Sequence, residues 1–446
     1  MMIHVGLDFG TSNSSIALFK DGRIQLFDLD LASINPHMLR SFIFINRAHD
    51  HFVGAEAVNQ YQKLETGRPV YWETRNMGQI KMVVAGGGGP IIYWDDLLIQ
   101  VDTAAQGRLI QSIKTALRNP RYEGTDVFDK YYSVDALIAV LFTALRERCE
   151  AATGEEVGGV VLGRPVKFSD DPKVDARAQQ KIELAAQQAG FKEIQFEFEP
   201  IAAAYLYHRQ AEERQPVLVF DFGGGTLDMT VMEVGGGQPP DVLATHGVLL
   251  GGDDLERVLM QPMKKHFGEG ATLRNRSPLP AHLMGMLDSW QTMVLLSRPE
   301  YRSLLRSARR GSDPDSIRRL ETLVNKNLGF LLFQEIERTK IALSSAATAL
   351  VQLDTPDLRV KELVTRPQFE RLIAPYVAQV DVALDEVLAQ SGLKAEQIKA
   401  VLRTGGTSEI PAYTHLLIRK FGYGHLRKLS PFETIVGGLA IKAGEL

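Results

Sequence analysis

Two short segments of the sequence each place a turn of small residues directly after an aspartate. The first reads DFGTSNS from Asp8 and the second reads DFGGGTLD from Asp221. Glycine lets the backbone approach a ligand closely, and successive N–H groups in such a turn form a nest that binds anions. One such turn is most often only a hairpin, but the pair favours phosphate binding. The expected phosphate-binding residues are Gly10, Thr11, Ser12, Asn13, Gly223, Gly224, Gly225 and Thr226.

The aspartates of these segments would bring carboxylates close to bound phosphates. Asp8, Asp221 and Asp228 would repel a triphosphate unless a cation lay between them. Mg²⁺ suits this place because it keeps several waters and takes few protein ligands. The alternative for any one of them is an aspartate that caps its own turn. We expect Asp8 and Asp221 to hold Mg²⁺ through water.

Other glycine-rich segments carry less information. Neither turn is a P-loop or a Rossmann fingerprint, because both of those open a helix with a different spacing. Gly86–Gly89 before Pro90 lacks such a pattern and is interpreted as a loop. The segment VLRTGGTSEIP could set a base or sugar against Gly405 and Gly406, although a plain strand-to-helix turn explains it equally well.

The elements that position these residues alternate between strands and helices. Apolar runs predict strands at 3–9, 15–19, 157–162, 194–198 and 217–222. Helices are expected at 134–152, 174–189, from 200 onward, up to about 346, and at 432–442. VGLDFGTSNSSIALF and VFDFGGGTLDMTVMEV share one layout, which suggests two related lobes. The expected fold class is α/β, with each lobe a mixed sheet packed with helices.

Bulk composition narrows the class of protein. A chain of 446 residues, 45% hydrophobic and 23% charged, requires more than one domain. The net charge of −4 and the lack of a basic block argue against nucleic acid. Cys149 is the single cysteine, so no internal disulfide forms and a reducing compartment is expected. Without a signal sequence or a stretch of about 20 apolar residues, we expect a cytoplasmic protein with no membrane span.

Taken together, these motifs resemble the ATPase domain of DnaK-type heat-shock chaperones, a family that shares its fold with actin and sugar kinases. Besides the two turns, the matching segments are FVGAEAV, SIKTALR, FEPIAAAYLY, LLGGDDLE, IERTKIALSS, TGGTSEIP and SPFETIVGGLA. They cover the whole chain and are closest to the bacterial YegD-like group. The resemblance implies a two-lobed actin-like ATPase fold with the nucleotide cleft between the lobes.

The same resemblance assigns roles to residues. Lys114, Glu199, Thr226 and Asp228 are implied as catalytic: Lys114 neutralises charge at the γ-phosphate, Glu199 orients water and Asp228 assists proton removal. The implied cofactors are ATP or ADP with Mg²⁺, and K⁺ is admitted as a further cation. The remaining nucleotide-binding residues carried over from the family are Gly251, Gly252, Glu337, Lys340, Ile341, Ser344, Gly405, Gly406, Thr407, Glu409 and Ile410.

Three departures from the family qualify this assignment. Ile341 and Glu409 stand where some relatives clasp adenine with arginines, and Phe432 replaces an acidic residue. Residues 1–213 are expected to form lobe I, with a helical or irregular insertion at about 65–110. Residues 214–446 are expected to form lobe II, with an extended insertion at about 268–330. From the resemblance, we expect a chain that lacks the family's peptide-binding domain after the closing helix.

The function this predicts is a DnaK-like ATPase coupled to unidentified protein partners or co-chaperones. Two alternatives remain open at this point: an actin-like filament-forming scaffold and a small-molecule kinase.

Overall fold

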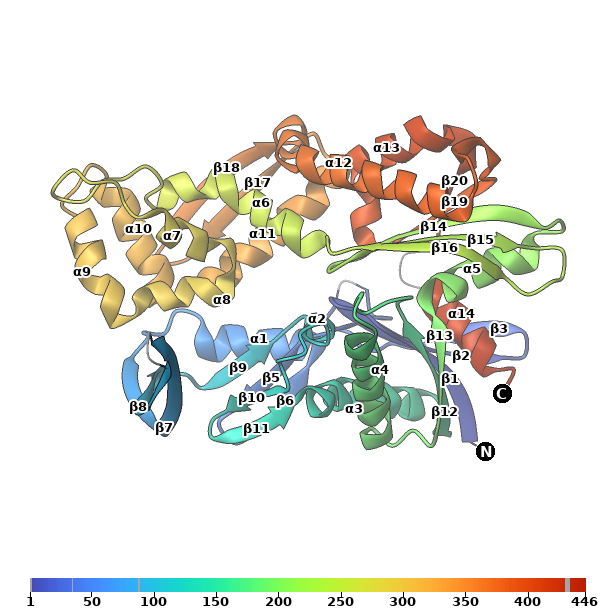
Figure 1. Cartoon of the computed structure of the whole chain (residues 1–446), viewed down its shortest axis with the longest axis horizontal. Coiled ribbons are helices and arrows are strands. Elements are labelled where there is room, and N and C mark those ends of the chain that lie inside the picture. Colours follow the sequence, from blue (N-terminus) through green and yellow to red (C-terminus); the bar gives the residue numbers. More distant parts are fainter. Residues whose placement is uncertain (1, 34, 87–88, 430–433) are drawn as a thin grey trace.

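The computed structural model describes residues 2–33, 35–86, 89–429 and 434–446, without the side chains of residues 77–95 and 97. The chain folds into two lobes, which form the lower and upper halves of Figure 1. Each lobe is built around one mixed sheet with helices packed on it, so the expected α/β fold class is confirmed.

The sheet of lobe I has the strand order β13-β12-β1-β2-β3, and β4 also pairs with β2. β1 runs parallel to β12 and antiparallel to β2. Asp21 and Gly22 both have positive φ, as a two-residue hairpin turn between β2 and β3 requires. The strands are β1 (Met2–Phe9), β2 (Asn13–Lys20), β3 (Arg23–Leu26), β4 (Leu39–Arg40), β12 (Glu156–Arg164) and β13 (Glu193–Phe198).

The sheet of lobe II repeats this plan. Its order is β16-β15-β14-β19-β20, and β14 runs parallel to β19 and antiparallel to β15. β14 therefore corresponds to β1, β15 to β2 and β19 to β12. The duplication predicted from the two turns is confirmed at the level of strand order. The strands are β14 (Gln215–Phe222), β15 (Leu227–Val234), β16 (Asp241–Val248), β19 (Ala400–Thr404) and β20 (Leu426–Lys428).

Long helices cover the outer side of each sheet, and two helices lie between the sheets (Figure 1). In lobe I the covering helices are α3 (Val134–Thr153) and α4 (Pro172–Gln188), and in lobe II they are α12 (Arg366–Ser391) and α13 (Pro411–Phe421). Between the sheets, α5 (Glu199–Gln210) packs against α14 (Thr434–Ala443). Residues 430–433, with Phe432 and the expected start of the closing helix at 432, lie outside the described residues.

The helix α14 packs onto the lobe I sheet although its residues follow lobe II in sequence. It contacts β1, β2 and β12. The contact is close, since a Cβ on Gly6 would lie 2.2 Å from the backbone nitrogen of Ala440. The predicted lobe II, residues 214–446, includes α14, whereas in the structure this helix packs on the sheet of lobe I. The division of the chain near residue 213 otherwise remains a prediction.

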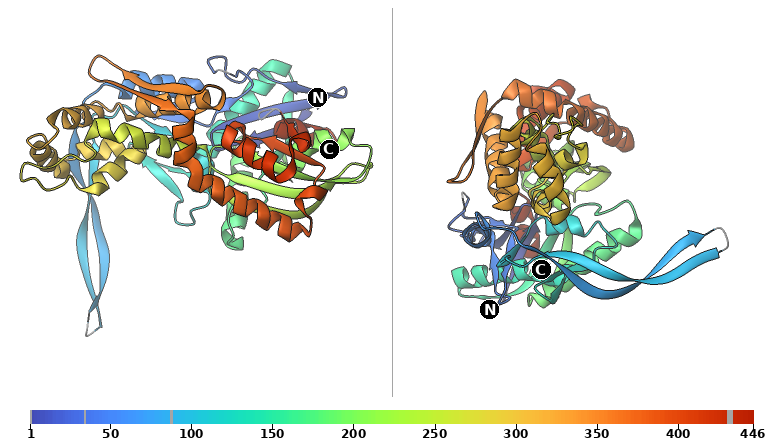
Figure 2. Two further views of the ribbon diagram at one scale, coloured as in Figure 1. Left: turned by 90° about the horizontal axis from the view of Figure 1, so that it is seen from above. Right: turned by 90° about the vertical axis from the view of Figure 1, so that its left-hand side faces the viewer.

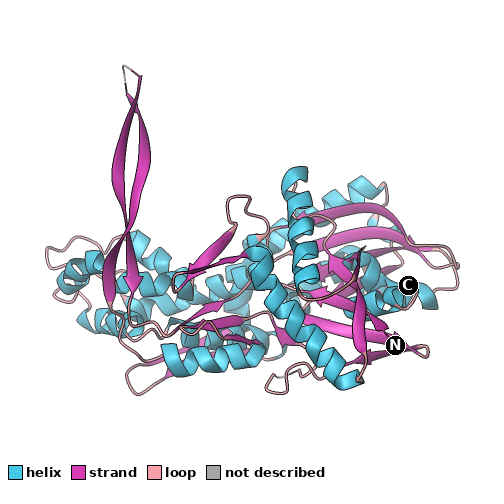
Figure 3. Cartoon of the chain, turned by 90° about the horizontal axis from the view of Figure 1, so that it is seen from below, coloured by secondary structure: helices cyan, strands magenta, loops and turns pink. Residues whose placement is uncertain are grey.

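Most of the insertion expected at 65–110 is a long β-hairpin. Its two strands, β7 (Trp72–Gly86) and β8 (Gly89–Asp102), pair with each other and with none of the other described strands. Figures 2 and 3 show them projecting far from the body, and we call them the arm. The expectation of a helical or irregular segment is wrong for residues 72–86 and 89–102. The central glycines of the loop expected at Gly86–Gly89 lie outside the described residues.

Smaller elements complete lobe I beside the base of the arm. The three-stranded sheet β6-β5-β9 packs against the helix α1. The bounds are β5 (Ile43–Asn46), β6 (His51–Val53), α1 (Gly54–Glu65), β9 (Gly107–Ile110), α2 (Ile113–Ala116), β10 (Gly124–Val127) and β11 (Lys130–Ser133).

The insertion expected at 268–330 is a cluster of short helices in lobe II. Apolar residues such as Leu283, Leu296 and Leu320 are fully buried, so it shares the core of that lobe. It leads into α11, which carries the segment resembling the family's adenosine-side helix. The remaining elements are α6 (Gly252–Met260), α7 (Ala281–Gly285), α8 (Trp290–Met293), α9 (Pro299–Ala308), α10 (Pro314–Asn325), α11 (Gly329–Ser345), β17 (Thr348–Asp354) and β18 (Arg359–Thr365).

Candidate nucleotide site

The two glycine-rich turns occupy equivalent places in the two sheets. In lobe I, Asp8 pairs with Ser15 across β1 and β2, and in lobe II, Asp221 pairs with Asp228 across β14 and β15. Residues 10–13 and 223–226 therefore fill loops of the same length between matched strand positions. Asp228 has no acidic counterpart in lobe I, where Ser15 stands in its place.

The two turns meet at the junction of the lobes. A Cβ on Gly224 would lie 2.1 Å from Ser12 Oγ, and a Cβ on Gly225 would lie 3.0 Å from Thr11 Oγ1. Only a residue without a side chain fits at Gly224 in this closed arrangement. A side chain at Gly224 would displace the hydroxyl of Ser12, so glycine at this position favours the close approach of the turns.

A cavity of about 120 Å³ lies between the turns. It is lined by both turns and by all four expected catalytic residues, together with both expected metal-binding aspartates. The lining residues taken from the sequence predictions are Asp8, Gly10, Thr11, Ser12, Asn13, Lys114, Glu199, Asp221, Gly223, Gly224, Gly225, Thr226, Asp228, Gly405 and Gly406.

Glycines and a threonine from outside the second turn fix its conformation. Gly405 has φ of 78°, and a Cβ there would lie 2.9 Å from Asp221 Oδ1. The hydroxyl of Thr407 and the backbone N–H of Gly252 both donate hydrogen bonds to Gly223 O, at 2.8 and 3.1 Å. A Cβ on Gly251 would lie 2.1 Å from Gly224 O. These residues, expected to bind nucleotide, also hold the phosphate turn in place.

Lys114 and Glu199 form a buried ion pair at the inner end of the cavity. The distance between Lys114 Nζ and Glu199 Oε1 is 2.7 Å, and the two side chains are 12% and 8% exposed. Lys114 lies in α2, and Glu199 lies in the first turn of α5, beside Pro200. Burial lowers the pKa of Lys114, but the carboxylates of Glu199 and Asp8 outweigh it, so the pKa is raised and the lysine stays charged.

The carboxylates around this lysine are crowded. Burial and then the charge of Glu199 raise the pKa of Asp8 to about 7 and that of Asp228 to about 6. Burial and then Glu199 also raise the pKa of Asp221 well above its ordinary value. Negative charge in the cavity therefore exceeds what Lys114 neutralises, which is the condition for recruiting a cation.

This donor set fits hydrated Mg²⁺ better than a directly ligated metal. Among the described residues, no group of three or more His, Cys, Asp or Glu side chains converges closely enough to hold a metal directly. Mg²⁺ keeps most of its waters and needs only one or two carboxylates together with phosphate oxygens. Asp8 and Asp221 are the residues that would hold it, through water.

The residues expected to contact the nucleoside divide into two groups. Glu337 and Lys340 line a second cavity of about 310 Å³, which adjoins the first at Thr11, Ser12 and Gly224. Lys340 Nζ pairs with Glu256 at 2.6 Å. The structure does not bring the other group, namely Ile341, Ser344, Glu409 and Ile410, into either cavity.

Ile341 and Glu409, which were expected to contact the adenine base, lie in exposed surroundings. The Ile341 residue is 59% exposed, and Glu409 pairs with Lys428 at 2.7 Å. Neither residue lines the two cavities described above.

Sequence reasoning missed three polar residues of the second cavity. Arg40 donates to Glu337 at 2.9 Å, and Ser112 donates to Asp253 at 3.3 Å, so both contacts join lobe I to lobe II. Arg40 reaches the cleft because β4 pairs with β2, where Arg40 lies opposite Asn13. No motif marks Arg40, whereas Ser112 and Asp253 lie in the matched segments SIKTALR and LLGGDDLE, which gave neither residue a role.

Aromatic side chains close the outer end of the cleft. Tyr61 of lobe I contacts Trp290 and Phe330 of lobe II, with ring centroids 5.6 and 5.0 Å apart. Phe42 meets Phe330 at 6.2 Å. Edge-on aromatic contacts of this kind stabilise beyond the area they bury. We call these four residues the aromatic clamp.

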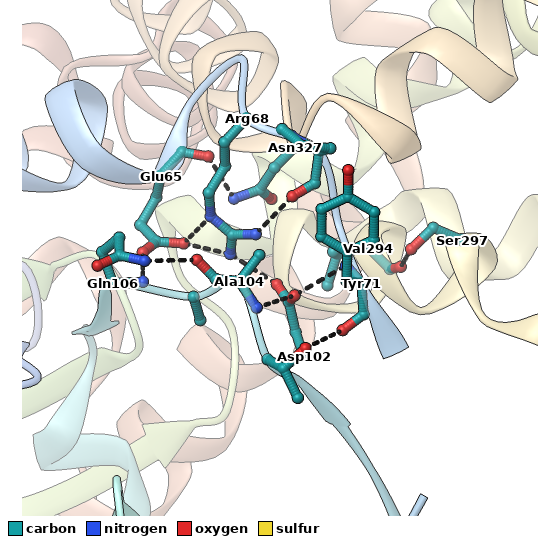
Figure 4. Close-up of polar contacts among 12 residues, drawn as sticks. Glu65, Arg68, Tyr71, Asp102, Ala104, Gln106, Val294, Ser297 and Asn327 are labelled. Atoms are coloured by element: carbon teal, nitrogen blue, oxygen red, sulfur yellow. Dashed lines mark hydrogen bonds and ion pairs between the residues drawn. The ribbon is translucent and has the colours of Figure 1, made fainter. Parts of the chain in front are cut away.

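A polar network surrounds the base of the arm (Figure 4), and Asn327 connects it to the clamp. Asn327 of lobe II donates to the hydroxyl of Tyr61 at 3.1 Å and to the carbonyl of Glu65 at 3.0 Å. The guanidinium of Arg68 bridges the carboxylates of Glu65 and Asp102, and Asp102 is the last residue of β8. The arm and the closed cleft thus share one set of contacts.

In the described part of the chain, no helix is both long enough and apolar enough to span a bilayer.

Comparison with known proteins identifies the class that this fold and site define. The family model described as Hsp70 protein matches residues 101–278 and 320–446, which is more than half of the chain. The chain therefore belongs to the Hsp70 family, whose fold is the two-lobed actin-like ATPase fold. The resemblance to DnaK-type proteins stated from the sequence is confirmed.

One similar curated protein is a chaperone protein dnaK from Gracilaria tenuistipitata var. liui. It is 24% identical over 454 aligned positions, covering 99% of this chain. The chain spans 60% of the length of that relative. The two segments matched by the family model flank the helical insertion of lobe II, so residues 279–319 fall outside the family pattern.

Proposed function

We propose that this chain is a chaperone-type ATPase that binds Mg-ATP between its lobes and hydrolyses it to ADP and phosphate. The single observation that carries the proposal is the meeting of two register-matched turns at a cavity that also contains Lys114, Glu199 and Asp228. Membership of the Hsp70 family favours this activity over a filament scaffold or a small-molecule kinase.

In the proposed mechanism the protein positions reactants and stabilises charge. The backbone N–H groups of both turns hold the phosphates, as anion nests do. Lys114 stays protonated beside Glu199 and neutralises charge at the γ-phosphate. Glu199 and Asp228 accept hydrogen bonds from the attacking water, and Asp228 takes its proton. Mg²⁺, when bound, screens the phosphate charge from Asp8 and Asp221.

Coupling to protein partners follows from where the nucleotide sits. Because both lobes contribute phosphate-binding residues, the bound nucleotide favours the closed arrangement in which the turns touch. Hydrolysis and release then change the preference between closed and open lobes. We propose that partners or co-chaperones read this change. The proposed lobes are residues 1–213 and 214–446, except that α14 packs on the sheet of lobe I.

Calorimetry with Mg-ATP, Mg-ADP and ATP plus a chelator tests the binding step, and phosphate release without an added acceptor tests hydrolysis. We expect ATP binding that requires Mg²⁺, followed by slow turnover. Absence of binding at millimolar Mg-ATP would refute the proposal. ATP-dependent sedimentation of polymers would favour the scaffold, and turnover that requires a small-molecule acceptor would favour the kinase.

A further inference from the structure

The two segments that connect the arm to lobe I are fastened to different lobes. Residues 66–72, which we call the entry segment, run from α1 into the first residue of β7. Residues 102–106, which we call the exit segment, run from the last residue of β8 to β9. Both segments belong to lobe I by sequence. The contacts of the entry segment nevertheless reach lobe II, whereas the exit segment is held by lobe I.

Two parts of lobe II hold the entry segment. The backbone N–H of Gly67 donates to the carbonyl of Lys326 at 2.8 Å, just beyond α10. The indole N–H of Trp72 donates to Ser297 Oγ at 2.8 Å. The guanidinium of Arg298 lies over the ring of Trp72, 5.0 Å from its centroid. We call the contact of Trp72 with Ser297 and Arg298 the foot contact.

Lobe II presents the acceptor of the foot contact in a fixed position. Ser297 is buried, and its hydroxyl donates to the carbonyl of Val294 at 2.6 Å (Figure 4). The hydroxyl proton is thereby engaged, and a lone pair remains for the indole N–H of Trp72. Trp72, Ser297 and Arg298 all lie outside the segments matched by the Hsp70 family model. The foot contact is therefore made by the insertions of this chain.

The exit segment is fastened to lobe I. Arg47, in the turn between β5 and β6, donates to the carbonyls of Thr103 and Ala105 at 2.8 and 2.6 Å. Glu65, the last residue of α1, accepts a hydrogen bond from the backbone N–H of Gln106. These contacts attach the second strand of the arm to the body of lobe I.

The entry and exit segments are joined to each other by stronger contacts than the foot contact. Arg68 and Asp102 form an ion pair at 2.6 Å, and their side chains are only 14% and 13% exposed. The N–H of Tyr71 donates to Asp102, and the N–H of Thr103 donates to the carbonyl of Tyr71. A buried charge-assisted contact is stronger than the neutral hydrogen bond from Trp72 to a serine. When the lobes separate, the foot contact therefore breaks first and the arm stays with lobe I.

We propose that the root of the arm is a strap across the cleft, which fastens lobe I to lobe II through the foot contact when the lobes are closed. The strap slows nucleotide exchange, because opening requires Trp72 to leave Ser297 and Arg298. By linkage, anything that lifts the arm from lobe II favours the open cleft. The inference rests on the proposed function, because a nucleotide between the lobes is what favours their closure.

Stopped-flow displacement of a fluorescent ADP from the full-length protein tests the strap. Trp72→Phe removes the indole N–H but retains an aromatic ring beside Arg298, and it should quicken ADP release about two- to tenfold. Trp72→Ala also removes the ring and should quicken release further. Tyr71→Ala is the matched control, because this neighbouring aromatic residue is exposed and its ring takes no part in the foot contact. ADP release from the control should match that from the wild type.

Hydrogen exchange at the root separates a strap from a general loss of stability. The amide of Gly67 is bonded to lobe II, whereas the amide of Thr103 is bonded to Tyr71 within the root. In the wild type, removal of Mg-ADP should quicken exchange at Gly67 and leave Thr103 protected. Trp72→Ala should quicken exchange at Gly67 even with Mg-ADP bound. Mass spectrometry of short peptides that contain either amide measures both rates.

The outcomes discriminate among the explanations. Equal ADP release from the wild type, Trp72→Phe and Trp72→Ala would overturn the strap, as would equal quickening at Gly67 and Thr103 in Trp72→Ala. Failure of the protein to bind Mg-ADP would instead refute the proposed function. The nucleotide-free proteins would then still test the foot contact: faster exchange at Gly67 in Trp72→Ala than in the wild type supports it, and equal exchange overturns it.

Discussion

Arg40 of lobe I and Glu337 of lobe II form an ion pair across the cleft between the lobes, with 2.9 Å between Nη2 and Oε2. Both side chains are about one third exposed or less, at 27% and 33%. The pair lies between the phosphate turns and the aromatic clamp. Opening the cleft must break it.

Removing this pair should accelerate release of ADP by a small factor. Arg40→Ala loses an interaction of roughly 0.2–1 kcal/mol for a partly exposed pair, so release should quicken by a factor of about 1.4 to 5. Stopped-flow displacement of a fluorescent ADP measures the rate. Lys20→Ala breaks a comparable pair within lobe I, Lys20–Glu155 at 3.2 Å, and should have no effect. An equal acceleration in both variants would show that the Arg40–Glu337 pair does not specifically slow the release of ADP.

Asn327 should contribute to the stability of the protein, because it bonds two residues of lobe I. Asn327→Ala leaves the Glu65 carbonyl and the Tyr61 hydroxyl without their donor, at a cost of about 1–3 kcal/mol. We expect a thermal midpoint lowered by a few degrees and faster exchange of ADP. Asn275→Ala, at an exposed turn, serves as the control. Unchanged exchange with a lowered midpoint would mean that the network stabilises the fold without controlling opening of the cleft.

Lys114 and Glu199 should be required for turnover and dispensable for binding. Lys114→Ala or Glu199→Ala is expected to abolish hydrolysis, because each acts beside the γ-phosphate. Calorimetry should still detect Mg-ATP. Lys192→Ala removes an exposed surface pair with Glu156 and should leave turnover intact. Normal hydrolysis in the double variant would remove both residues from the mechanism.

The raised pKa of Asp228 predicts that the rate of ATP hydrolysis falls at acidic pH. A carboxylate must be ionised to accept a proton, and the pKa of Asp228 is raised to about 6 in the free protein. Below its pKa the rate should fall tenfold for each pH unit. Bound Mg²⁺ favours the ionised form and moves the midpoint lower. Single-turnover rates between pH 4.5 and 8 check this, and Asp228→Asn should flatten the limb at a low rate.

Cys149 should be inert in the folded protein. It is fully buried in α3, and burial raises the pKa of its thiol to about 12. Since the thiolate is the reactive species, a thiol reagent at pH 8 should modify it only after unfolding. Labelling with 5,5′-dithiobis(2-nitrobenzoate) with and without denaturant measures this. Rapid labelling of the native state would show that α3 opens locally.

The parts of the site that could be predicted from sequence are those encoded locally. Each phosphate turn lies within one short segment, so an aspartate, a run of small residues and flanking apolar strands were enough to identify it. Lys114 and Glu199 needed the family resemblance, because a lone lysine or a glutamate before proline has ordinary explanations. The structure brings both to the cavity with the two turns.

The parts that could not be predicted depend on packing between distant segments. Arg40 and Glu337 are separated by 297 residues, and nothing near either one indicates the contact. The arm escaped detection because its glycine run and its mixed composition resemble a loop, whereas the strands are long. The adenosine-side residues were assigned by family position, and the open surroundings of Ile341 follow from the shape of lobe II.

The packing of α14 onto the sheet of lobe I has a consequence for the order of synthesis. The helix α14, residues 434–443, leaves the ribosome after all the described strands. It nevertheless covers β1, β2 and β12 of lobe I. During translation, the apolar face beneath Ala440 and Leu439 therefore stays exposed to solvent until α14 is made. The nascent lobe must remain soluble with this face uncovered. Completion of the first lobe therefore waits until the whole of lobe II has been synthesised.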